Sequence, residues 1–372
     1  MDLSWWEIKN WFSDVDFTIV GSGIVGLHAA LRLRENFPES KILVLEKGIL
    51  PQGASTKNAG FACFGSLSEI VDDLSNNSDE NVIRLIQKRW KGLQIIRKNL
   101  QDTVLDFKQF GGFELFLTQH RALLEESLTK MSYVNKLLFP IFKSDVFTQQ
   151  TNVFGFKNVD EKLIFNPFEA QIDTGNMMQA LLKKAISQDI LILNHQNVTA
   201  FHENKNGVEV ALDDFSFQTK KLLFATNGFA GQLTKAAVKP ARAQVLITEP
   251  IRGLNIKGTF HLDRGYYYFR NIGDRILFGG GRNLDFDGET TTEFGQTERI
   301  QNQLEKMLRE VILPDQVFKI EHRWSGIMGL GAAKDPIVEQ MSEDVYCGVR
   351  LGGMGVAMGS LVGQELADLI KK

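Results

Sequence analysis

Hydrophobic side chains near the start of the chain follow the order strand, helix, strand. Residues 16–20 are rich in strand-forming types, among them Phe17, Ile19 and Val20, and the run stops at Gly21. From Ile24 the apolar side chains recur at helical spacing, and Pro38 separates this helix from a second apolar run at residues 42–45. The pattern predicts a β-α-β unit.

Three glycines occupy the turn between the first strand and the helix. Gly21 permits a tight turn, Gly23 lets a diphosphate approach the backbone, and Gly26 lets the helix pack closely on the strand. Glu46 lies 20 positions after Gly26, where a carboxylate can accept both hydroxyls of an adenosine ribose. An acid at this place argues against NADP. We therefore expect a dinucleotide site, with an ordinary glycine turn as the alternative.

The rest of the chain changes pattern several times before strand, glycine turn and helix return at its end. We expect helices in 68–110, 120–139 and 171–187, the last capped by Asp173 or Thr174, strands in 111–119 and 220–225, a hairpin at Asn206-Gly207, and mostly strands in 241–320. Two similar glycine turns at opposite ends, with β-rich material between them, predict one interleaved protein instead of tandem domains.

Composition narrows the class of protein. A length of 372 residues suggests roughly two domains, and a net charge of −3 without long Lys or Arg runs indicates no nucleic-acid partner. Two cysteines fit a reducing compartment, and no apolar run is long enough for a transmembrane segment. We expect a cytoplasmic protein whose Trp5, Trp6 and Trp11 pack as a cap on the first domain.

Six motifs together resemble a known family. They read TIVGSGIVG…LVLEKG, GASTKNAG, ATNGFAG, YYYFR…RILFGGG, HRWSGIMG and LGGMGVAMGS…AD. This series resembles the FAD-dependent oxidoreductases of the D-amino-acid oxidase superfamily, and most of all the glycine oxidase, sarcosine oxidase and γ-glutamylputrescine oxidoreductase branch. The resemblance implies an α/β (α+β overall) fold. A Rossmann-like FAD-binding domain would come from 1–80, 168–240 and 322–372, and a mainly antiparallel β substrate-binding domain from 81–167 and 241–321.

The resemblance also implies which residues hold the cofactor. Those expected at the ADP half are Gly21, Ser22, Gly23, Ile24, Val25, Gly26, Glu46, Lys47, Val198, Ala225, Thr226 and Asn227. Those expected at the flavin are Ser55, Thr56, Asn58, Ala59, Gly60, Gly326, Gly352, Gly353, Met354, Gly355 and Val356. Gly352, Gly353, Met354 and Gly355 would bring backbone N–H groups and a helix N-terminus to the N1-C2=O edge, where negative charge gathers on reduction.

Covalent linkage of the flavin is not expected. Lys57 stands where one branch of the family has a linking histidine, and no cysteine stands near SGIMG, where sarcosine oxidases have theirs. Cys63 is a minor candidate for linkage, and a buried structural role suits it better. We therefore expect dissociable, non-covalent FAD.

The substrate residues depart from the family pattern. Strand alternation places Tyr266, Tyr268 and Arg270 on one face of GYYYFR, and Tyr266 matches a family tyrosine near the substrate carboxylate. Met328 stands where the family has the arginine that binds that carboxylate. Either another arginine supplies the charge, with Arg270 preferred over Arg323 and Arg242, or the substrate presents no α-carboxylate there.

The function implied is oxidation of an amine or amino acid. Hydride transfer from the carbon next to nitrogen to flavin N5 would give an imine that hydrolyses. Leu277 stands near the place of the lysine that promotes oxygen reactivity in sarcosine oxidases, so the acceptor, oxygen or an electron carrier, stays open, as does the oligomeric state. The alternatives are a 2-hydroxy-acid dehydrogenase with His322 as base, and a flavoprotein acting on a macromolecule.

Overall fold

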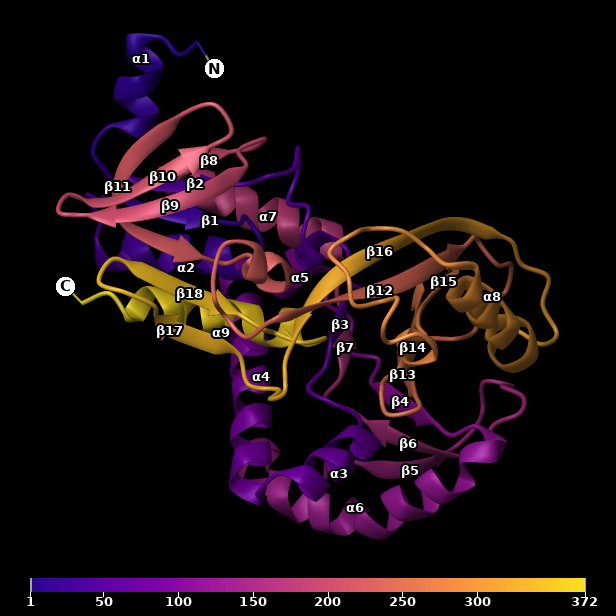
Figure 1. Ribbon diagram of the computed structural model, residues 1–372. Coiled ribbons are helices and arrows are strands. Elements are labelled where there is room, and N and C mark those ends of the chain that lie inside the picture. Colours follow the sequence, from indigo (N-terminus) through magenta and orange to yellow (C-terminus); the bar gives the residue numbers. More distant parts are fainter. Residues whose placement is uncertain (1, 372) are drawn as a thin grey trace.

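Two large β-sheets lie next to each other in the computed structural model, which describes residues 2–371 (Figure 1). The first has the strand order β17-β18-β11-β1-β2-β8, with β10 and then β9 joined to β11. Its strands are β1 (Val15–Val20), β2 (Ile42–Leu45), β8 (Leu191–Leu193), β9 (Val198–Asn204), β10 (Gly207–Leu212), β11 (Ser216–Phe224), β17 (Ile337–Gln340) and β18 (Val345–Val349).

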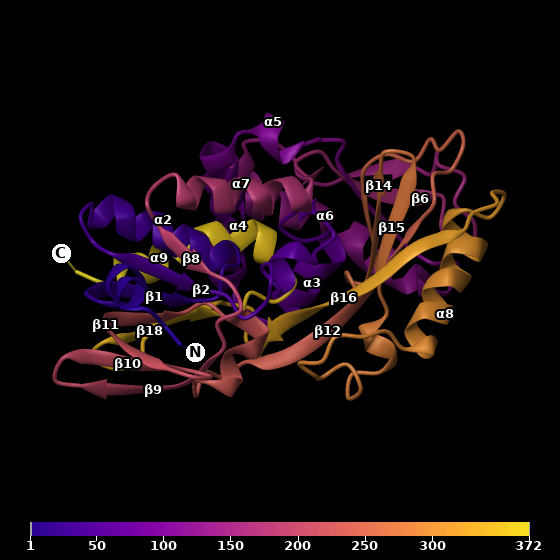
Figure 2. The same cartoon turned by 90° about the horizontal axis from the view of Figure 1, so that it is seen from above.

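The centre of the first sheet is parallel and buried on both faces. β1 pairs in parallel with β2 and β11, which fits the continuous apolar run of β2 and the apolar ends of β1 and β11, Ile19-Val20 and residues 222–224. Helices α2 (Ile24–Asn36), α7 (Thr174–Ile186) and α9 (Gly355–Asp368) lie on one face, and the β9–β10 hairpin lies on the other (Figure 2). The predicted β-α-β unit and the hairpin at Asn206-Gly207 are both confirmed.

The second sheet is mainly antiparallel. Its order is β16-β12-β15-β14-β13-β4-β6-β5, and the pair β13–β4 is parallel. The strands are β4 (Gly112–Leu115), β5 (Thr148–Thr151), β6 (Lys162–Asn166), β12 (Lys239–Thr248), β13 (Thr259–Leu262), β14 (Tyr267–Ile272), β15 (Arg275–Gly280) and β16 (Ile320–Leu330). A small third sheet joins β3 (Phe61–Ala62) to β7 (Ala170–Gln171). The predicted fold class is confirmed.

Except for α1, the remaining helices pack around the second sheet and between the two sheets. They are α1 (Trp5–Glu7), α3 (Leu67–Asn76), α4 (Asp79–Leu100), α5 (Asp102–Leu105), α6 (Arg121–Phe142) and α8 (Glu298–Met307). Helix α8 lies within 241–320, where strands were predicted to dominate. Its buried Ile300, Leu304 and Met307 recur at helical spacing, so the sequence pattern did contain this helix.

Two elements join the parts that the predicted domain boundaries separate. Helix α4, which begins at Asp79 and lies almost entirely after the boundary at residue 80, crosses α9, and the Ser360 hydroxyl donates a 2.6 Å hydrogen bond to the Gly92 carbonyl. Strand β16 leaves the second sheet, where it pairs with β12, and leads into β17 of the first sheet. The domain division itself stays a prediction, but these crossings tie the two sheets together.

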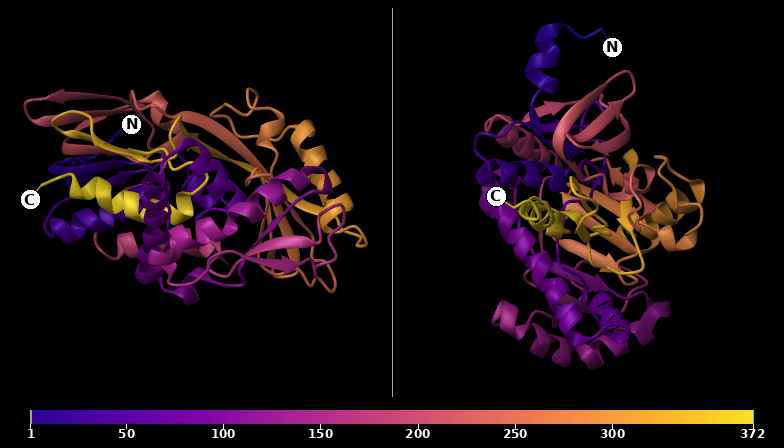
Figure 3. Two further views of the ribbon diagram at one scale, coloured as in Figure 1. Left: turned by 90° about the horizontal axis from the view of Figure 1, so that it is seen from below. Right: turned by 60° about the vertical axis from the view of Figure 1, so that its left-hand side comes forward.

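The N-terminal tryptophans do not form the cap that the sequence suggested. Helix α1 stands away from the rest of the chain (Figures 1 and 3), and the exposed fractions of Trp5 and Trp6 are 62% and 65%. In this segment Phe12 is the side chain that packs inward, against Phe215 and Phe217. The expected packing of the tryptophans is therefore wrong. Among residues 2–371, no helix has the length and apolar character needed to cross a membrane.

The crossing of α4 and α9 generates a stability prediction. A Cβ at Gly92 would lie 2.1 Å from the Ala357 carbonyl oxygen, and backbone cannot turn away as a side chain can. We expect Gly92→Ala to lower the free energy of unfolding by about 2–3 kcal/mol, measured by urea denaturation. Gly231→Ala is the control, because its Cβ would have only an ordinary 3.8 Å contact. Equal stability of the two variants would show that the crossing is not tight.

Candidate functional site

A cavity of about 1060 Å³ lies between the two sheets. Its wall comes from both ends of the chain: the turn after β1, the loop after β2, the end of β11, strand β16 and the turn before α9. Strands β13 and β14 of the second sheet close the remaining side. The volume is at the upper end for ligand sites, as a ligand of dinucleotide size requires.

The first glycine turn presents bare backbone to the cavity. A Cβ at Gly26 would lie 1.9 Å from the Gly21 carbonyl oxygen, so only glycine lets α2 start this close to β1. Gly23 precedes α2 without offering a side-chain cap, and the Ser55 hydroxyl accepts the Ile24 N–H at 2.9 Å. The N-terminus of α2 therefore faces the cavity with its partial positive charge.

Glu46 lines the cavity but is already bound to protein donors. One carboxylate oxygen accepts the N–H and the hydroxyl of Ser22, and the other accepts the N–H groups of Gly48 and Gln52. These four bonds hold the turns after β1 and β2 together. A ribose at this site would have to share the carboxylate with Ser22.

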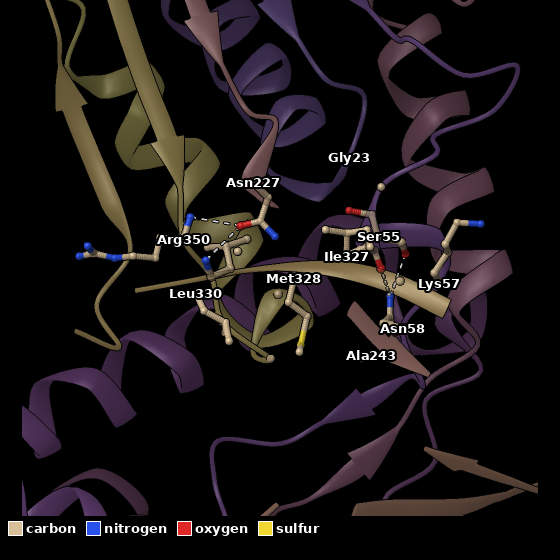
Figure 4. Close-up of a pocket in the computed structure, with 18 of the residues that line it drawn as sticks. Gly23, Ser55, Lys57, Asn58, Asn227, Ala243, Ile327, Met328, Leu330 and Arg350 are labelled. Carbon is tan, nitrogen blue, oxygen red and sulfur yellow. Dashed lines mark hydrogen bonds between the residues drawn. The ribbon is translucent and has the colours of Figure 1, made fainter. Parts of the chain in front are cut away.

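The loop after β2 is shaped by Asn58. Its amide nitrogen donates to the Ser55 carbonyl at 2.8 Å, and its oxygen accepts the Gly60 N–H at 2.8 Å and the Thr174 hydroxyl at 2.9 Å. Figure 4 shows Ser55 and Asn58 on one side of β16, with Lys57 beside them. This loop thereby keeps its backbone at the cavity wall.

The second glycine turn, residues 351–355, meets the first one at the same cavity. The Asn227 side-chain oxygen, at the end of β11, accepts the N–H groups of Arg350 at 3.1 Å and Leu351 at 3.2 Å (Figure 4). Gly352 has a φ of +58°, and a Cβ there would point into open space. Helix α9 begins at Gly355 without a side-chain cap, so its first N–H groups are free for a ligand.

The features of the wall fit a bound FAD. Two helix N-termini whose N-cap residues offer no side-chain cap face the cavity, and the buried Thr226 hydroxyl, also in its wall, has no hydrogen-bond partner among residues 2–371. At α2 the Ser55 hydroxyl already accepts the Ile24 N–H. Free N–H groups and an unpaired hydroxyl are donors that a diphosphate and a flavin edge can use. The donor set therefore suits the cofactor that the sequence suggests.

Most of the cofactor residues predicted from the sequence line this cavity. They are Gly21, Gly23, Ile24, Val25, Glu46, Lys47, Ser55, Asn58, Ala59, Val198, Ala225, Thr226, Asn227, Gly326, Gly352, Gly353, Met354, Gly355 and Val356. Ser22, Gly26, Thr56 and Gly60 are not part of the wall. The Thr56 hydroxyl donates to the Pro51 carbonyl at 2.6 Å, so it orders the loop from behind.

Aromatic rings form the end of the cavity nearest the second sheet. The Phe61 ring lies edge-on to His261, at 5.3 Å between centroids, and to Tyr268, at 5.6 Å. Tyr266 and Tyr268 face the cavity, while Tyr267 belongs to the core, as strand alternation predicted. Burial raises the pKa of Tyr268 to about 12, so its hydroxyl keeps its proton near neutral pH.

The arginines proposed from the sequence as carboxylate ligands have other partners. Arg270 is buried outside the cavity wall, where its guanidinium donates to the carbonyls of Ala59 and Ile172. The other two candidates form ion pairs: Arg242 with Glu289 at 2.7 Å, and Arg323 with Glu305 at 2.6 Å. Strand alternation correctly placed Arg270 on the same face as Tyr268. It could not show that backbone carbonyls would accept the hydrogen bonds of the Arg270 guanidinium.

His322 and Met328 lie at different places along β16. Met328 lines the cavity (Figure 4), as its correspondence to a substrate-binding position suggests. His322 is exposed, stacks on Trp324 at 5.8 Å between ring centroids, and is not part of the wall. The base expected of a hydroxy-acid enzyme is therefore not at the cavity in this structure.

A buried ion pair at the aromatic end was missed from the sequence. His261 Nε2 lies 2.8 Å from a Glu169 carboxylate oxygen, which also accepts the Thr259 hydroxyl. Burial lowers the pKa of His261, but the charge and hydrogen bond of Glu169 outweigh it and raise the pKa to about 9. Burial, then the Glu169 charge, raises the pKa of the adjacent Cys63 thiol. No sequence signal links His261 to a partner 92 residues away.

The pair generates a pH prediction. A histidine with a folded pKa of about 9 and an unfolded value of 6.5 stabilises the fold fully below pH 6.5, and loses this contribution as pH rises through about 9. We expect the free energy of unfolding, measured by urea denaturation, to fall by roughly 3 kcal/mol between pH 6.5 and 10 because of His261.

Glu169→Gln should remove most of this dependence and lower the His261 pKa below 6.5, because the ring stays buried without the charge. NMR titration of the histidine ring protons measures that pKa, and His202→Gln, at an exposed strand position, is the control. An unchanged His261 pKa in Glu169→Gln contradicts the assignment.

Comparisons with known proteins agree with this geometry. A model of the FAD dependent oxidoreductase family matches residues 16–369. Gamma-glutamylputrescine oxidoreductase of Escherichia coli (strain K12) is 24% identical over 395 residues, which cover 96% of this chain and 83% of that protein.

Two crystal structures share the fold. Glycine oxidase from Geobacillus kaustophilus superposes with a TM-score of 0.75 and 16% identity, covering 96% of this chain and 95% of that one. L-proline dehydrogenase from P. horikoshii has a TM-score of 0.73 and 18% identity, with 96% and 93% covered. The family resemblance seen in the sequence motifs is confirmed, and this chain belongs to the FAD dependent oxidoreductases.

Proposed function

We propose that this FAD-dependent oxidoreductase oxidises an amine or amino acid at the carbon next to nitrogen. One observation carries the proposal: the histidine at the cavity, His261, is held as a cation by Glu169, and the candidate base His322 lies outside the wall. Oxidation of a hydroxyl requires a base to take its proton, whereas an amine that binds neutral requires none. The names of the relatives, which refer to glutamylputrescine, glycine and proline, support the same substrate class.

The chain's own backbone would hold the cofactor, without a covalent bond. The turn at Gly21 and Gly23, with the α2 N-terminus, would bind the diphosphate, and Gly352 to Gly355, with the α9 N-terminus, would donate to the flavin edge. When bound, FAD supplies the two-electron oxidation by accepting a hydride from the substrate carbon.

The wall residues would orient the substrate and exclude water. Phe61 and Tyr268 offer flat apolar surfaces, and the Tyr268 hydroxyl can donate a hydrogen bond because it stays protonated. The substrate loses a hydride from carbon and a proton from nitrogen. Water then adds to the resulting imine, which gives a carbonyl compound and an amine.

The residue at position 277 bears on which electron acceptor reoxidises the flavin. Leu277 is 2% exposed and packs with Ala59 and Val245, so no cation occupies this position of β15. Oxygen and a protein or quinone carrier remain the two acceptors to compare. The rate at which reduced protein reoxidises in air separates them.

A donor panel tests the substrate class. The purified protein is mixed without oxygen with secondary amines, D- and L-amino acids, acylated polyamines and 2-hydroxy acids, and the flavin absorbance is followed. We expect bleaching by at least one amine or amino acid and none by hydroxy acids. Bleaching by hydroxy acids alone would overturn the proposal.

Replacing His322 distinguishes amine oxidation from hydroxy-acid oxidation. We expect His322→Ala to change kcat/KM for the amine substrate less than twofold, because the ring is exposed and is not part of the cavity wall. An enzyme that needed His322 as a general base would lose about 100-fold or more. Flavin content and Tm of the variant show whether any loss comes from folding instead.

A further inference from the structure

Arg89 is a buried cation without a counter-ion. It lies in the middle of α4, is 4% exposed and forms part of the cavity wall. One guanidinium nitrogen, Nη1, donates to the Phe64 carbonyl at 2.8 Å, while the buried Nε has no hydrogen-bond partner. No carboxylate among residues 2–371 lies within 4.0 Å of it. A charge removed from water in this way is costly unless a ligand pairs with it.

The free edge of this guanidinium suits a carboxylate. Nε and Nη2 share one edge of the planar group, and the one side-chain hydrogen bond of Arg89 to residues 2–371, from Nη1 to Phe64, does not use that edge. Two parallel N–H donors match the two oxygens of a carboxylate, which is the strongest of the common charged contacts. Lysine in this place would keep the charge but lose the two parallel donors of the planar guanidinium.

The acidic groups near Cys63 and His261 accept hydrogen bonds from other donors. Glu114 accepts the hydroxyls of Ser66 and Ser68, and Glu169 accepts His261. Glu69, which also lines the cavity, accepts the Ser66 N–H at 3.0 Å and caps α3. These carboxylates are therefore held by donors other than Arg89.

Other arginines of the cavity wall do not need a ligand. Arg264 is exposed and lies 3.7 Å from Asp72, and Arg350 donates to the Asp335 carbonyl. Arg282 is partly exposed and lies over the Phe286 ring at 4.7 Å, so water can solvate its free N–H groups. Arg89 combines burial with a free edge.

Arg89 belongs to the substrate end of the cavity. Its charge acts on the thiol of Cys63, and the Cys63 sulfur lies within 4.8 Å of the ligand atoms of Glu169 and His261. His261 in turn contacts the Phe61 ring beside Tyr268. The tight crossing at Gly92, one turn further along α4, fixes the distance of Arg89 from the α9 N-terminus.

We propose that Arg89 binds a carboxylate of the substrate, so that the substrate is an amine that also carries a carboxylate. This inference rests on the proposed amine oxidation and makes its substrate class narrower. It also accounts for Met328, because the cation comes from a helix of the first half of the chain and not from β16. Arg89 would thus select among amines without taking part in the electron transfer.

Binding of simple probes tests the proposal independently of turnover. Benzoate and its neutral analogue benzamide are titrated into the FAD-loaded protein, and Kd is measured from the flavin difference spectrum and from the shift in Tm. For Arg89→Gln we expect the benzoate Kd to rise about 30-fold, which is about 2 kcal/mol at 1.4 kcal/mol per tenfold. The benzoate Kd of Arg89→Lys should lie between those of wild type and Arg89→Gln. The benzamide Kd should be the same in all three proteins.

The control is Arg84→Gln, an exposed arginine of the same helix that pairs with Asp335. It should leave the benzoate Kd unchanged. Arg282→Gln separates the two cavity arginines: a loss of benzoate binding in this variant, with none in Arg89→Gln, overturns the proposal. So does an Arg89→Gln protein that binds benzoate as wild type does.

Stability without ligand distinguishes a binding role from a structural one. We expect the Tm of Arg89→Met, measured without probe, to equal or exceed that of wild type, because an unpaired buried charge is removed. Benzoate should raise the Tm of wild type only. A large drop in the Tm of Arg89→Met, together with no benzoate effect in wild type, shows that Arg89 is structural.

Flavin content separates failure of this inference from failure of the proposed function. If Arg89→Gln loses FAD but its reloaded form binds benzoate normally, Arg89 serves the cofactor and the inference is wrong. If the donor panel finds no amine substrate while benzoate binding still depends on Arg89, the amine proposal fails and the carboxylate site stands.

Discussion

The structure depends on bringing unpaired backbone N–H groups from both ends of the chain to one cavity. Asn227 makes this possible, because its side-chain oxygen accepts two N–H groups of the turn before α9 at the place where β11 ends beside β1. Helices α2 and α9 then begin at the same wall, and neither N-cap residue, Gly23 or Met354, caps its helix with a side chain. Capping residues would have satisfied the N–H groups that an anionic cofactor needs.

Glycine permits the close approaches on which this arrangement relies. Gly26 brings α2 against the turn after β1, and Gly92 brings α4 against the backbone of α9. The contact at Gly92 also matters for the proposed substrate site, because it fixes α4 and therefore holds Arg89 beside the cavity. The same helix crossing thus stabilises the protein and positions a charge that its substrate is proposed to use.

Charge at the aromatic end is distributed unequally. Glu169 and His261 compensate each other, and Glu114 is held by serine hydroxyls, so these groups are satisfied within the protein. Arg89 is not. The protein with an unpaired buried cation is less stable than the same protein with a bound anion. Proteins commonly give up stability in this way at a binding site.

The sequence by itself determined the fold class and predicted most of the residues that line one end of the cavity. Glycine spacing, apolar runs and helix periodicity are local properties, so the β-α-β unit, the N-cap at Asp173 and the placement of Gly21, Gly23 and Glu46 at the cavity wall followed from them. Most of the other expected cofactor residues at the wall came from the resemblance of the motifs to the family. Even the facing of Tyr266 and Tyr268 followed, because strands alternate with a period of two.

Only the tertiary structure decided which charged side chains are free. Arg270 lies on the expected face, yet the carbonyls of Ala59 and Ile172, more than 90 positions away, occupy it. The reverse holds for Arg89, which follows Leu85 and Ile86 at helical spacing on the apolar face of α4. That spacing indicated burial, but the lack of a partner depends on segments that meet only in the folded chain, because ion pairing is set by distance in space and not along the sequence.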